Sequence, residues 1–261
     1  MFDYHLHSNV SFDAKTPPMD IALAAKAAGL REICFTDHYD YNDDPAKAPD
    51  IFTAEDYAAA YDGLSVPELT IRRGVEFGMT PWNQQEAKKL LASYPFDFVI
   101  GSVHYVDGHD PYEAVYWQSE DVDRDFARYL QQTLRCVQLH EDFDVLGHLT
   151  YVCKSVHTPS HAPVLIESHR EITDAILQEL VKKGKGMEIN TSGVDRAGDF
   201  LPGADFLRRF KELGGEIITL GSDSHDTTRV GQYAPQALAL LKDIFGHVCT
   251  FQNRQPVFHK L

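Results

Sequence analysis

The sequence is poor in the features that mark secreted and membrane-bound proteins. Its 261 residues include only four cysteines, which are widely spaced and form no CxxC pair. We therefore expect reduced thiols and no disulfide framework, as in a cytoplasmic protein. No apolar run approaches the roughly 18 residues of a membrane-spanning helix. The first residues show no charged segment followed by an apolar one, so we expect no signal peptide.

Basic residues are also scarce. The chain has 24 Lys and Arg against 39 Asp and Glu, which gives a formal net charge of -15. This charge disfavours a broad nucleic-acid interface and an anionic membrane surface. It does not exclude a small anionic substrate, because bound metal ions can reverse the local potential. The net charge is therefore compatible with a small anionic substrate, and the sequence leaves the formation of a homo-oligomer open.

The chain does contain a regular alternation of short apolar runs and longer segments with helical period. The runs predict seven strands, at residues 1–6, 32–36, 69–77, 98–104, 145–148, 187–190 and 216–221, with a further short strand at 248–251. The periodic segments predict helices at 19–28, 53–61, 82–93, 119–139, 163–183, 204–213 and 232–245. Such alternation implies a parallel sheet with right-handed crossovers. Since no linker interrupts it, we expect one α/β domain over residues 1–261, built as a closed or nearly closed barrel.

Polar residues follow these strands one after another. They are His5, His7, Asp37, His38, Glu76, His104, His148, Asn190, Asp223 and His225. The C-terminal ends of the strands of a parallel barrel share one face, where catalytic groups collect. His5 and His7 are two residues apart, so both imidazoles point the same way from an extended strand. Asp223 and His225 repeat this spacing with a carboxylate.

One pair of histidines on a strand would be weak support for a metal site. Ionisable residues that end several apolar strands are harder to explain, because each needs a partner at the edge of a core. Coordination to metal ions supplies that partner. Nitrogen and oxygen ligands without a thiolate suit zinc, manganese or iron. More than four candidate ligands imply two or three divalent ions, an arrangement that is used in phosphoester hydrolysis.

Two basic residues follow strands on the same predicted face. Lys154 and Arg196 could clamp a phosphate group, and the alternative is that both are solvated surface charges. Most of the remaining histidines are expected on the surface or in loops. His109 is an exception, because it lies shortly after His104 in a loop that we expect near the active site.

Taken together, these motifs resemble the polymerase and histidinol phosphatase (PHP) superfamily, and most of all its histidinol-phosphatase branch. The resemblance lies in residues 3–8, 35–38, 74–76, 101–104, 145–148, 188–193 and 221–225, and so covers nearly the whole chain. It implies a distorted (β/α)7 TIM-like barrel with a trinuclear metal site. The order and spacing of the motifs are specific for the superfamily and less specific for the substrate.

The resemblance also implies a set of ligands. His5, His7, Glu76 and Asp223 would hold one ion; Glu76, His104 and His148 a second; His38, His225 and Asp13 a third. Some relatives have histidine in place of Asp13, which bears on the metal that the third site takes. Asp223 and His225 are expected to be catalytic, and Lys154 and Arg196 to bind phosphate. Thr150 departs from the family, in which Asp is common two residues after the Gly-His pair.

The expected reaction is hydrolysis of a small phosphate monoester, L-histidinol phosphate, to L-histidinol and phosphate, a step of histidine biosynthesis. A hydroxide held between the metals would attack phosphorus. The nearest alternative is a PHP phosphoesterase that acts on nucleotides or oligonucleotides, but the chain lacks a basic, aromatic track for single strands. A metal-dependent amidohydrolase is a more distant alternative, because Glu76 replaces its usual bridging lysine. A non-catalytic metal-binding domain would be expected to have lost ligands, and none of these positions is apolar.

Overall fold

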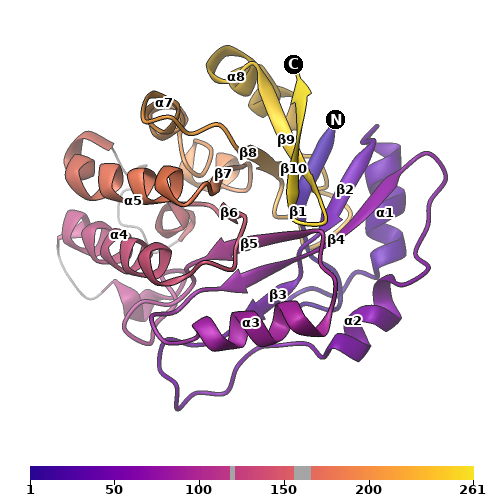
Figure 1. Cartoon of the computed structure of the whole chain (residues 1–261), viewed down its shortest axis with the longest axis horizontal. Helices are drawn as coiled ribbons and strands as arrows, with labels where there is room; N and C mark the ends of the chain where they lie inside the picture. The colour runs from indigo at the N-terminus through magenta and orange to yellow at the C-terminus, as the bar shows by residue number, and fades with distance from the viewer. Residues whose placement is uncertain (118–120, 156–165) are drawn as a thin grey trace.

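The computed structural model describes residues 1–117, 121–155 and 166–261. Seven parallel strands at its centre form a nearly closed barrel in the order β1-β2-β4-β5-β6-β7-β8 (Figure 1). Their bounds are β1 Phe2–Leu6, β2 Glu32–Phe35, β4 Thr70–Gly78, β5 Phe98–Ser102, β6 Val145–Leu146, β7 Gly186–Asn190 and β8 Ile218–Gly221. Beyond β8 the chain lies against β1, where the backbone N–H of Asp223 donates to the carbonyl of His5 at 2.8 Å. The predicted barrel of seven parallel strands is confirmed.

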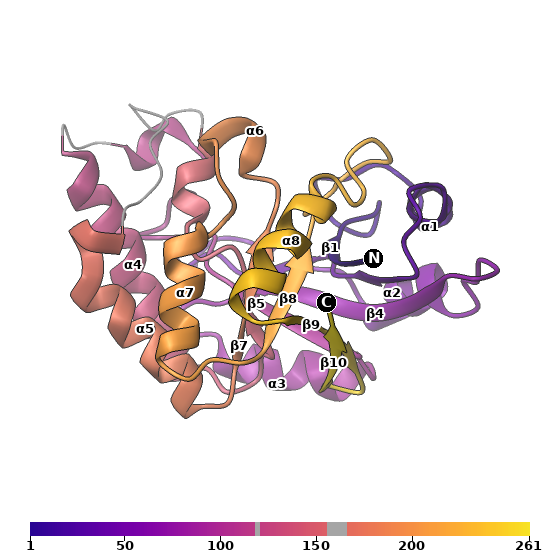
Figure 2. The same ribbon diagram turned by 90° about the horizontal axis from the view of Figure 1, so that it is seen from above.

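Helices cover the outside of this barrel. They are α1 Pro18–Ala27, α2 Ala54–Tyr61, α3 Gln84–Ser93, α4 Val122–Leu139, α5 Arg170–Lys182, α6 Val194–Ala197, α7 Ala204–Glu212 and α8 Ala234–Ile244, with 3-10 turns η1 Ala114–Tyr116, η2 Tyr151–Lys154 and η3 Ile166–His169. Helices α4, α5 and α7 lie side by side along one flank (Figure 2). None of the helices within the described ranges is both long enough and apolar enough to cross a membrane.

Local sequence explains where several helices begin. The side chain of Asp121 accepts a hydrogen bond from the backbone N–H of Arg124 and so caps α4, and Thr53 caps α2 in the same way, as its sequence predicts. In α4 the residues Phe126, Leu130 and Val137 recur on one face and are buried. Helix α4 begins at Val122, whereas the sequence predicted a helix over 119–139. Ser119 and Pro163, the predicted first residues of this helix and of the next, lie outside the described residues.

A short strand that the sequence did not predict sets the geometry of the site. Strand β3 (His38–Asp40) pairs in parallel with the second half of β4, whereas β2 pairs with the first half. This register places His38 opposite Glu76. A strand of three residues with polar ends shows no apolar run, so only the pairing reveals it.

The C-terminus also differs from the prediction of one short strand. It forms a hairpin of β9 (His247–Gln252) and β10 (Gln255–Lys260). Asn253 and Arg254 make the turn with positive φ angles, and the N–H of Asn253 donates to the Asp97 side chain at 3.0 Å. Since Asp97 precedes β5, the hairpin covers the N-terminal end of the barrel. The opposite end is left open for the polar residues.

Candidate metal centre

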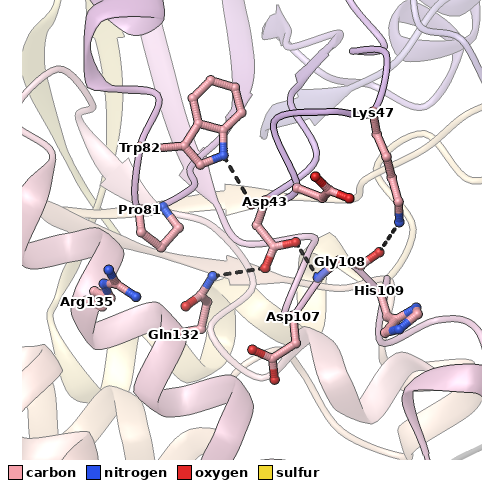
Figure 3. A pocket seen from close by; sticks show the side chains of 10 residues that line it. Asp43, Lys47, Pro81, Trp82, Asp107, Gly108, His109, Gln132 and Arg135 are labelled. Carbon is pink, nitrogen blue, oxygen red and sulfur yellow. Dashed lines mark hydrogen bonds between the residues drawn. The ribbon is translucent and has the colours of Figure 1, made fainter.

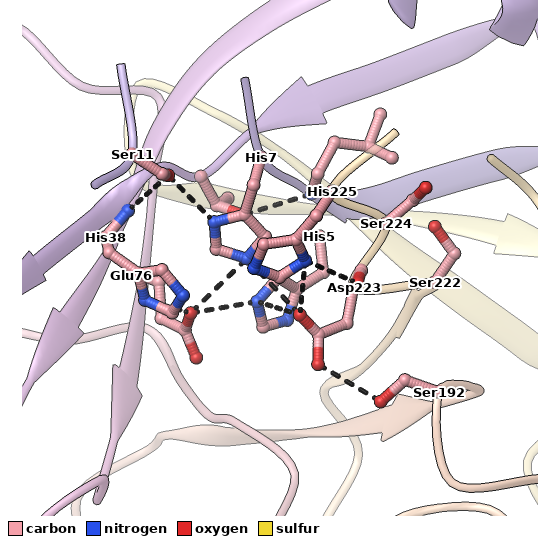
Figure 4. Close-up of polar contacts among 12 residues, drawn as sticks. His5, His7, Ser11, His38, Glu76, Ser192, Ser222, Asp223, Ser224 and His225 are labelled. Carbon is pink, nitrogen blue, oxygen red and sulfur yellow. Dashed lines mark hydrogen bonds and ion pairs between the residues drawn. The ribbon is translucent and has the colours of Figure 1, made fainter. Parts of the chain in front are cut away.

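The carboxylate of Glu76 contacts several histidines at the C-terminal end of the barrel, and Figure 4 shows it beside His5 and His38. Its Oε1 is 2.8 Å from His148 Nε2 and 3.2 Å from His104 Nε2. Its Oε2 is 3.1 Å from His5 Nε2 and 3.0 Å from His38 Nδ1. Both oxygens are therefore shared, as a carboxylate bridging two cations would be.

His7 and Asp223 both lie beside His5, with 5.0 Å between the centres of the two imidazole rings and 3.7 Å between His5 Nε2 and Asp223 Oδ1. The Nε2 atom of His7 is 3.3 Å from Asp223 Oδ1 and 3.5 Å from Glu76 Oε2. Candidate ligand atoms of His5, His7 and Asp223 all lie within 4.8 Å of one another. Asp223 has a φ angle of 55°, a left-handed conformation that is costly for a residue other than glycine and common at functional sites.

The third part of the cluster lies nearer to solvent. His225 Nε2 is 3.0 Å from Asp13 Oδ2, and His38 Nε2 is 3.7 Å from the same oxygen. His7, His38 and His225 also form a group with ligand atoms within 4.8 Å. All nine residues of the predicted ligand set thus lie in one place, although they come from six separate stretches of the chain.

Buried atoms without hydrogen-bond partners test whether these residues fit metal ions. Within the described residues they include Nε2 of His5 and His7, Nδ1 of His38 and Oε2 of Glu76. A buried polar atom that makes no hydrogen bond is costly, so such atoms normally have a partner. Here the unpartnered atoms are ligand nitrogens and oxygens that face one another. The donor set therefore fits divalent metal ions.

The electrostatics of the cluster agree with this interpretation. Burial opposes the ionisation of Glu76, but the imidazoles around it, His5 foremost, hold the pKa of this carboxyl well below its ordinary value. Burial by itself would lower the pKa of His38, yet the Glu76 carboxylate raises it to about 9. For His7 burial prevails, and its pKa falls well below the ordinary value. Cations that bind here would displace protons from the imidazoles.

A second layer of carboxylates orients the histidines, and the sequence analysis missed it. Asp40 Oδ2 is 2.9 Å from His104 Nδ1, and Glu188 Oε1 is 2.7 Å from His5 Nδ1. Each contact occupies one ring nitrogen and turns the other toward the cluster, as in many metal sites. The sequence spacing could have indicated both carboxylates, because side chains two residues apart on a strand share a face. Asp40 is two residues after His38 on β3, and Glu188 is two residues before Asn190 on β7.

The backbone of β8 passes so close to this second layer that one position requires glycine. A Cβ atom added at Gly221 would lie 2.3 Å from both Glu188 Oε1 and His5 Cβ. We predict that Gly221→Ala displaces His5, lowers the free energy of unfolding by about 1–3 kcal/mol and reduces metal content. Thermal melts and metal analysis of the variant test this, and unchanged values for both would contradict it.

A pocket of about 410 Å³ opens above the cluster. Both predicted phosphate-binding residues line it. Lys154 Nζ is 2.6 Å from Asp223 Oδ2, and Arg196 donates to the hydroxyl of Tyr112 while its guanidinium lies 5.1 Å from the centre of that ring. Arg229 lines the same pocket, and no sequence motif pointed to it. The pocket therefore collects basic side chains on an acidic protein.

The residue that the sequence singled out beside His104 lies elsewhere. His109 lines a separate cavity of about 660 Å³ with Asp43, Trp82 and Arg135 (Figure 3). The loop there is held by Lys47, whose ammonium donates to the Gly108 carbonyl at 2.5 Å. None of the predicted metal ligands lines this cavity. The smaller pocket, which holds the ligand cluster, is the candidate active site.

Comparison with known proteins finds relatives that match along nearly the whole chain. The family described as the PHP domain matches residues 3–192. A histidinol-phosphatase from Lactococcus lactis subsp. lactis is 34% identical over 258 residues, which cover 96% of this chain and 94% of that protein. A probable histidinol-phosphatase from Clostridium acetobutylicum is 29% identical over 264 residues, which cover 99% of this chain and 96% of that protein.

Solved structures show the same similarity. The crystal structure of histidinol phosphate phosphatase from Lactococcus lactis subsp. lactis, complexed with zinc, L-histidinol and phosphate, matches with a TM-score of 0.86, 30% identity and 98% coverage of both chains. A structure from Listeria monocytogenes matches with a TM-score of 0.74 at 16% identity, over 90% of this chain and 99% of that one. At that identity the second structure supports the fold alone.

Proposed function

The chain belongs to the PHP domain family, and on that premise we propose that it is a metal-dependent phosphatase that hydrolyses L-histidinol phosphate to L-histidinol and phosphate. The observation that carries the proposal is the cluster around Glu76, in which several buried ligand atoms make no hydrogen bond within the described residues. The relative whose name states this activity, and the solved structure that holds zinc, L-histidinol and phosphate, support the substrate.

We assign three ions to the cluster, each of them zinc, manganese or iron. The proposed ligand sets are His5, His7, Glu76 and Asp223 for the first, Glu76, His104 and His148 for the second, and His38, His225 and Asp13 for the third. When bound, such ions supply Lewis acidity toward phosphoryl oxygens and lower the pKa of water. Asp40, whose carboxylate contacts His104, also forms a candidate ligand group with His38 and His104.

The chain's own residues have further tasks in this proposal. Lys154 and Arg196 bind the phosphate oxygens, since both line the pocket above the cluster. Asp223 and His225 are the catalytic residues in this proposal, because both line the same pocket and follow the end of β8. The hydrogen bond from the backbone N–H of Asp223 to the carbonyl of His5 holds Asp223 in position. We also assign the enzyme to the cytoplasm, which fits its four buried cysteines, none of which forms a disulfide within the described residues.

The direct test is a phosphate-release assay of the purified protein loaded with zinc or manganese. We expect L-histidinol phosphate to be preferred over sugar phosphates and nucleotides by at least about tenfold in kcat/KM, which corresponds to about 1.4 kcal/mol. A preference for nucleotides would replace this proposal with the alternative substrate class of the same family. Bound metal without release of phosphate from any ester would exclude the phosphatase activity.

Variants of the basic residues test the phosphate-binding role. Arg196→Met and Lys154→Met each remove a charge from the pocket, and a hydrogen bond to a charged group contributes about 1.5–3 kcal/mol. We therefore expect the KM for the phosphate ester to rise about 10- to 100-fold. Because Lys154 also contacts Asp223, the metal content of its variant must be measured as well. Arg208→Met on the exposed surface of α7 is the control, and a KM unchanged in both pocket variants would refute the role.

A further inference from the structure

One buried carboxylate that follows a barrel strand has no place in the proposed ligand sets. Asp37 has no exposed surface and directly precedes His38. Its Oδ1 accepts hydrogen bonds from the backbone N–H of Ser8 at 2.7 Å and from the hydroxyls of Ser8 at 3.2 Å and Ser11 at 2.9 Å. The hydroxyl of Tyr61 donates to its Oδ2. Both oxygens are therefore engaged by donors, and within the described residues Asp37 belongs to none of the candidate ligand groups.

The hydroxyl of Ser11 links this carboxylate to a metal ligand. Its Oγ lies 3.1 Å from His7 Nδ1 and accepts a hydrogen bond from the backbone N–H of His38 at 3.0 Å (Figure 4). The other ring nitrogen of His7, Nε2, is 3.3 Å from Asp223 Oδ1 and is one of the buried ligand atoms without a hydrogen bond. Asp37 is thus connected to His7 through a single hydroxyl group.

A count of donors and acceptors at Ser11 decides which nitrogen of His7 carries a hydrogen. A serine hydroxyl has one hydrogen to donate and two lone pairs that accept. Ser11 gives its hydrogen to Asp37, so its lone pairs face the N–H of His38 and Nδ1 of His7. Only a hydrogen on Nδ1 makes the last contact a hydrogen bond, because two lone pairs would repel each other. The lone pair of His7 is therefore on Nε2, which lies in the cluster and can bind a cation.

The other ligand histidines show why a carboxylate is needed behind the hydroxyl. His5 and His104 each have a carboxylate oxygen directly on Nδ1, at 2.7 Å and 2.9 Å. A carboxylate accepts only, so it selects the tautomer with a hydrogen on Nδ1. A hydroxyl alone can turn its hydrogen either way and would select neither tautomer. Asp37 removes this freedom from Ser11.

We infer that Asp37 and Ser11 form a hydrogen-bond relay that fixes the tautomer of His7 and directs its Nε2 to a metal ion. Both are positioning residues, since they act on the metal through His7, and Ser8 and Tyr61 hold the carboxylate in place. The inference rests on the proposed metal site and names residues that set its affinity. Loss of such an outer partner lowers the affinity of a metal site about 10- to 100-fold.

The first test is the zinc affinity of Ser11→Ala, measured on the full-length protein by competition with a chelator. We expect the Kd of the weakened zinc site to rise about 10- to 100-fold, and Ser11→Thr, which keeps a hydroxyl, to recover the affinity to within about threefold. Ser93→Ala is the control, because it removes a hydroxyl that bonds only to the Leu90 carbonyl at the exposed end of α3. Unchanged zinc binding in Ser11→Ala, or equal losses in the alanine and threonine variants, would overturn the relay.

A double-mutant cycle tests whether Asp37 acts through Ser11. Asp37→Asn keeps the shape of the side chain but offers Ser11 a weaker acceptor. We expect it to weaken zinc binding in the otherwise unaltered protein and to have less than about a twofold effect in the Ser11→Ala background, because residues of one network are not additive. Additive losses would assign Asp37 to the structure of the loop and refute its part in the relay.

Two further readouts separate positioning from general damage to the fold. At saturating zinc, kcat of Ser11→Ala should return to within about threefold of the original value with an unchanged KM, because only metal binding was weakened. In zinc-loaded protein labelled with 15N-histidine, the Nδ1–H resonance of His7 should shift in Ser11→Ala, while those of His5 and His104 stay in place. A uniform change of all three resonances, or none, would contradict the relay.

Failure of the proposed function would look different. If the zinc-loaded protein released phosphate from no ester, the phosphatase activity would be wrong, but the zinc affinities and the His7 resonance would still judge the relay. If the protein hydrolysed L-histidinol phosphate and Ser11→Ala bound zinc as tightly as the unaltered chain, the relay alone would be refuted.

Discussion

Replacing Glu76 by glutamine is expected to lower kcat/KM for the phosphate ester about 1,000-fold or more, because it removes several kcal/mol of transition-state stabilisation by the metals. Glutamine has nearly the shape of glutamate, so the barrel should fold. It lacks the negative charge that both carboxylate oxygens share among His5, His38, His104 and His148. Metal analysis and steady-state kinetics on the same sample measure the effect.

Two features make this variant informative. Glu76 has no exposed surface, so its loss cannot be compensated by solvent. Glu167→Gln makes the same chemical change at an exposed residue of η3 and should leave activity and metal content unchanged. If the Glu76 variant kept its full metal content and stayed within about tenfold of the original kcat/KM, which is about 1.4 kcal/mol, the shared carboxylate would not be central to the site.

Removal of the metals is expected to destabilise the fold as well as to stop the reaction. A ligand that binds only the folded state at 1,000 times its Kd stabilises it by about 4 kcal/mol. In a chain of this size, each kcal/mol moves the Tm by about 2–4 °C. We therefore expect chelation to lower the Tm by about 8–16 °C per tightly bound ion, and zinc or manganese to restore it.

The physical reason lies in the unpartnered atoms of the cluster. Within the part of the chain that the structure describes, buried ligand atoms such as His5 Nε2 and His7 Nε2 make no hydrogen bond, so each needs a cation as its partner. Melting curves with and without chelator measure the shift, and Glu76→Gln supplies the matched comparison because its Tm should respond much less. An unchanged Tm in a protein shown by metal analysis to have lost its ions would mean that the cluster does not contribute to folding stability.

Much of the architecture follows from local features of the sequence. Apolar runs separated by helical periods predict parallel strands, and the parallel strands of a barrel place their C-terminal ends on one face. The polar residues that end those runs, from His5 to His225, were therefore expected together, and they do lie together. The two-residue spacing of His5 and His7 places both rings on one side of β1. Their separate roles as ligands remain proposals.

The tertiary structure alone decided which side chains meet across the barrel. The pairing of β3 with β4 places His38 opposite Glu76, although a strand of three residues has no pattern of its own. The contacts of Asp40 with His104 and of Glu188 with His5 join residues far apart in the sequence.

The contact between Asp40 and His104 illustrates the physical reason for this division. The sequence neighbours of Asp40 do not indicate which imidazole its carboxylate meets, because His104 comes from another part of the chain. Strand period and strand order are local properties that repeat along the sequence, so they can be predicted from it. The partner of a buried charge depends on distances between distant segments, and those distances are set only when the barrel closes.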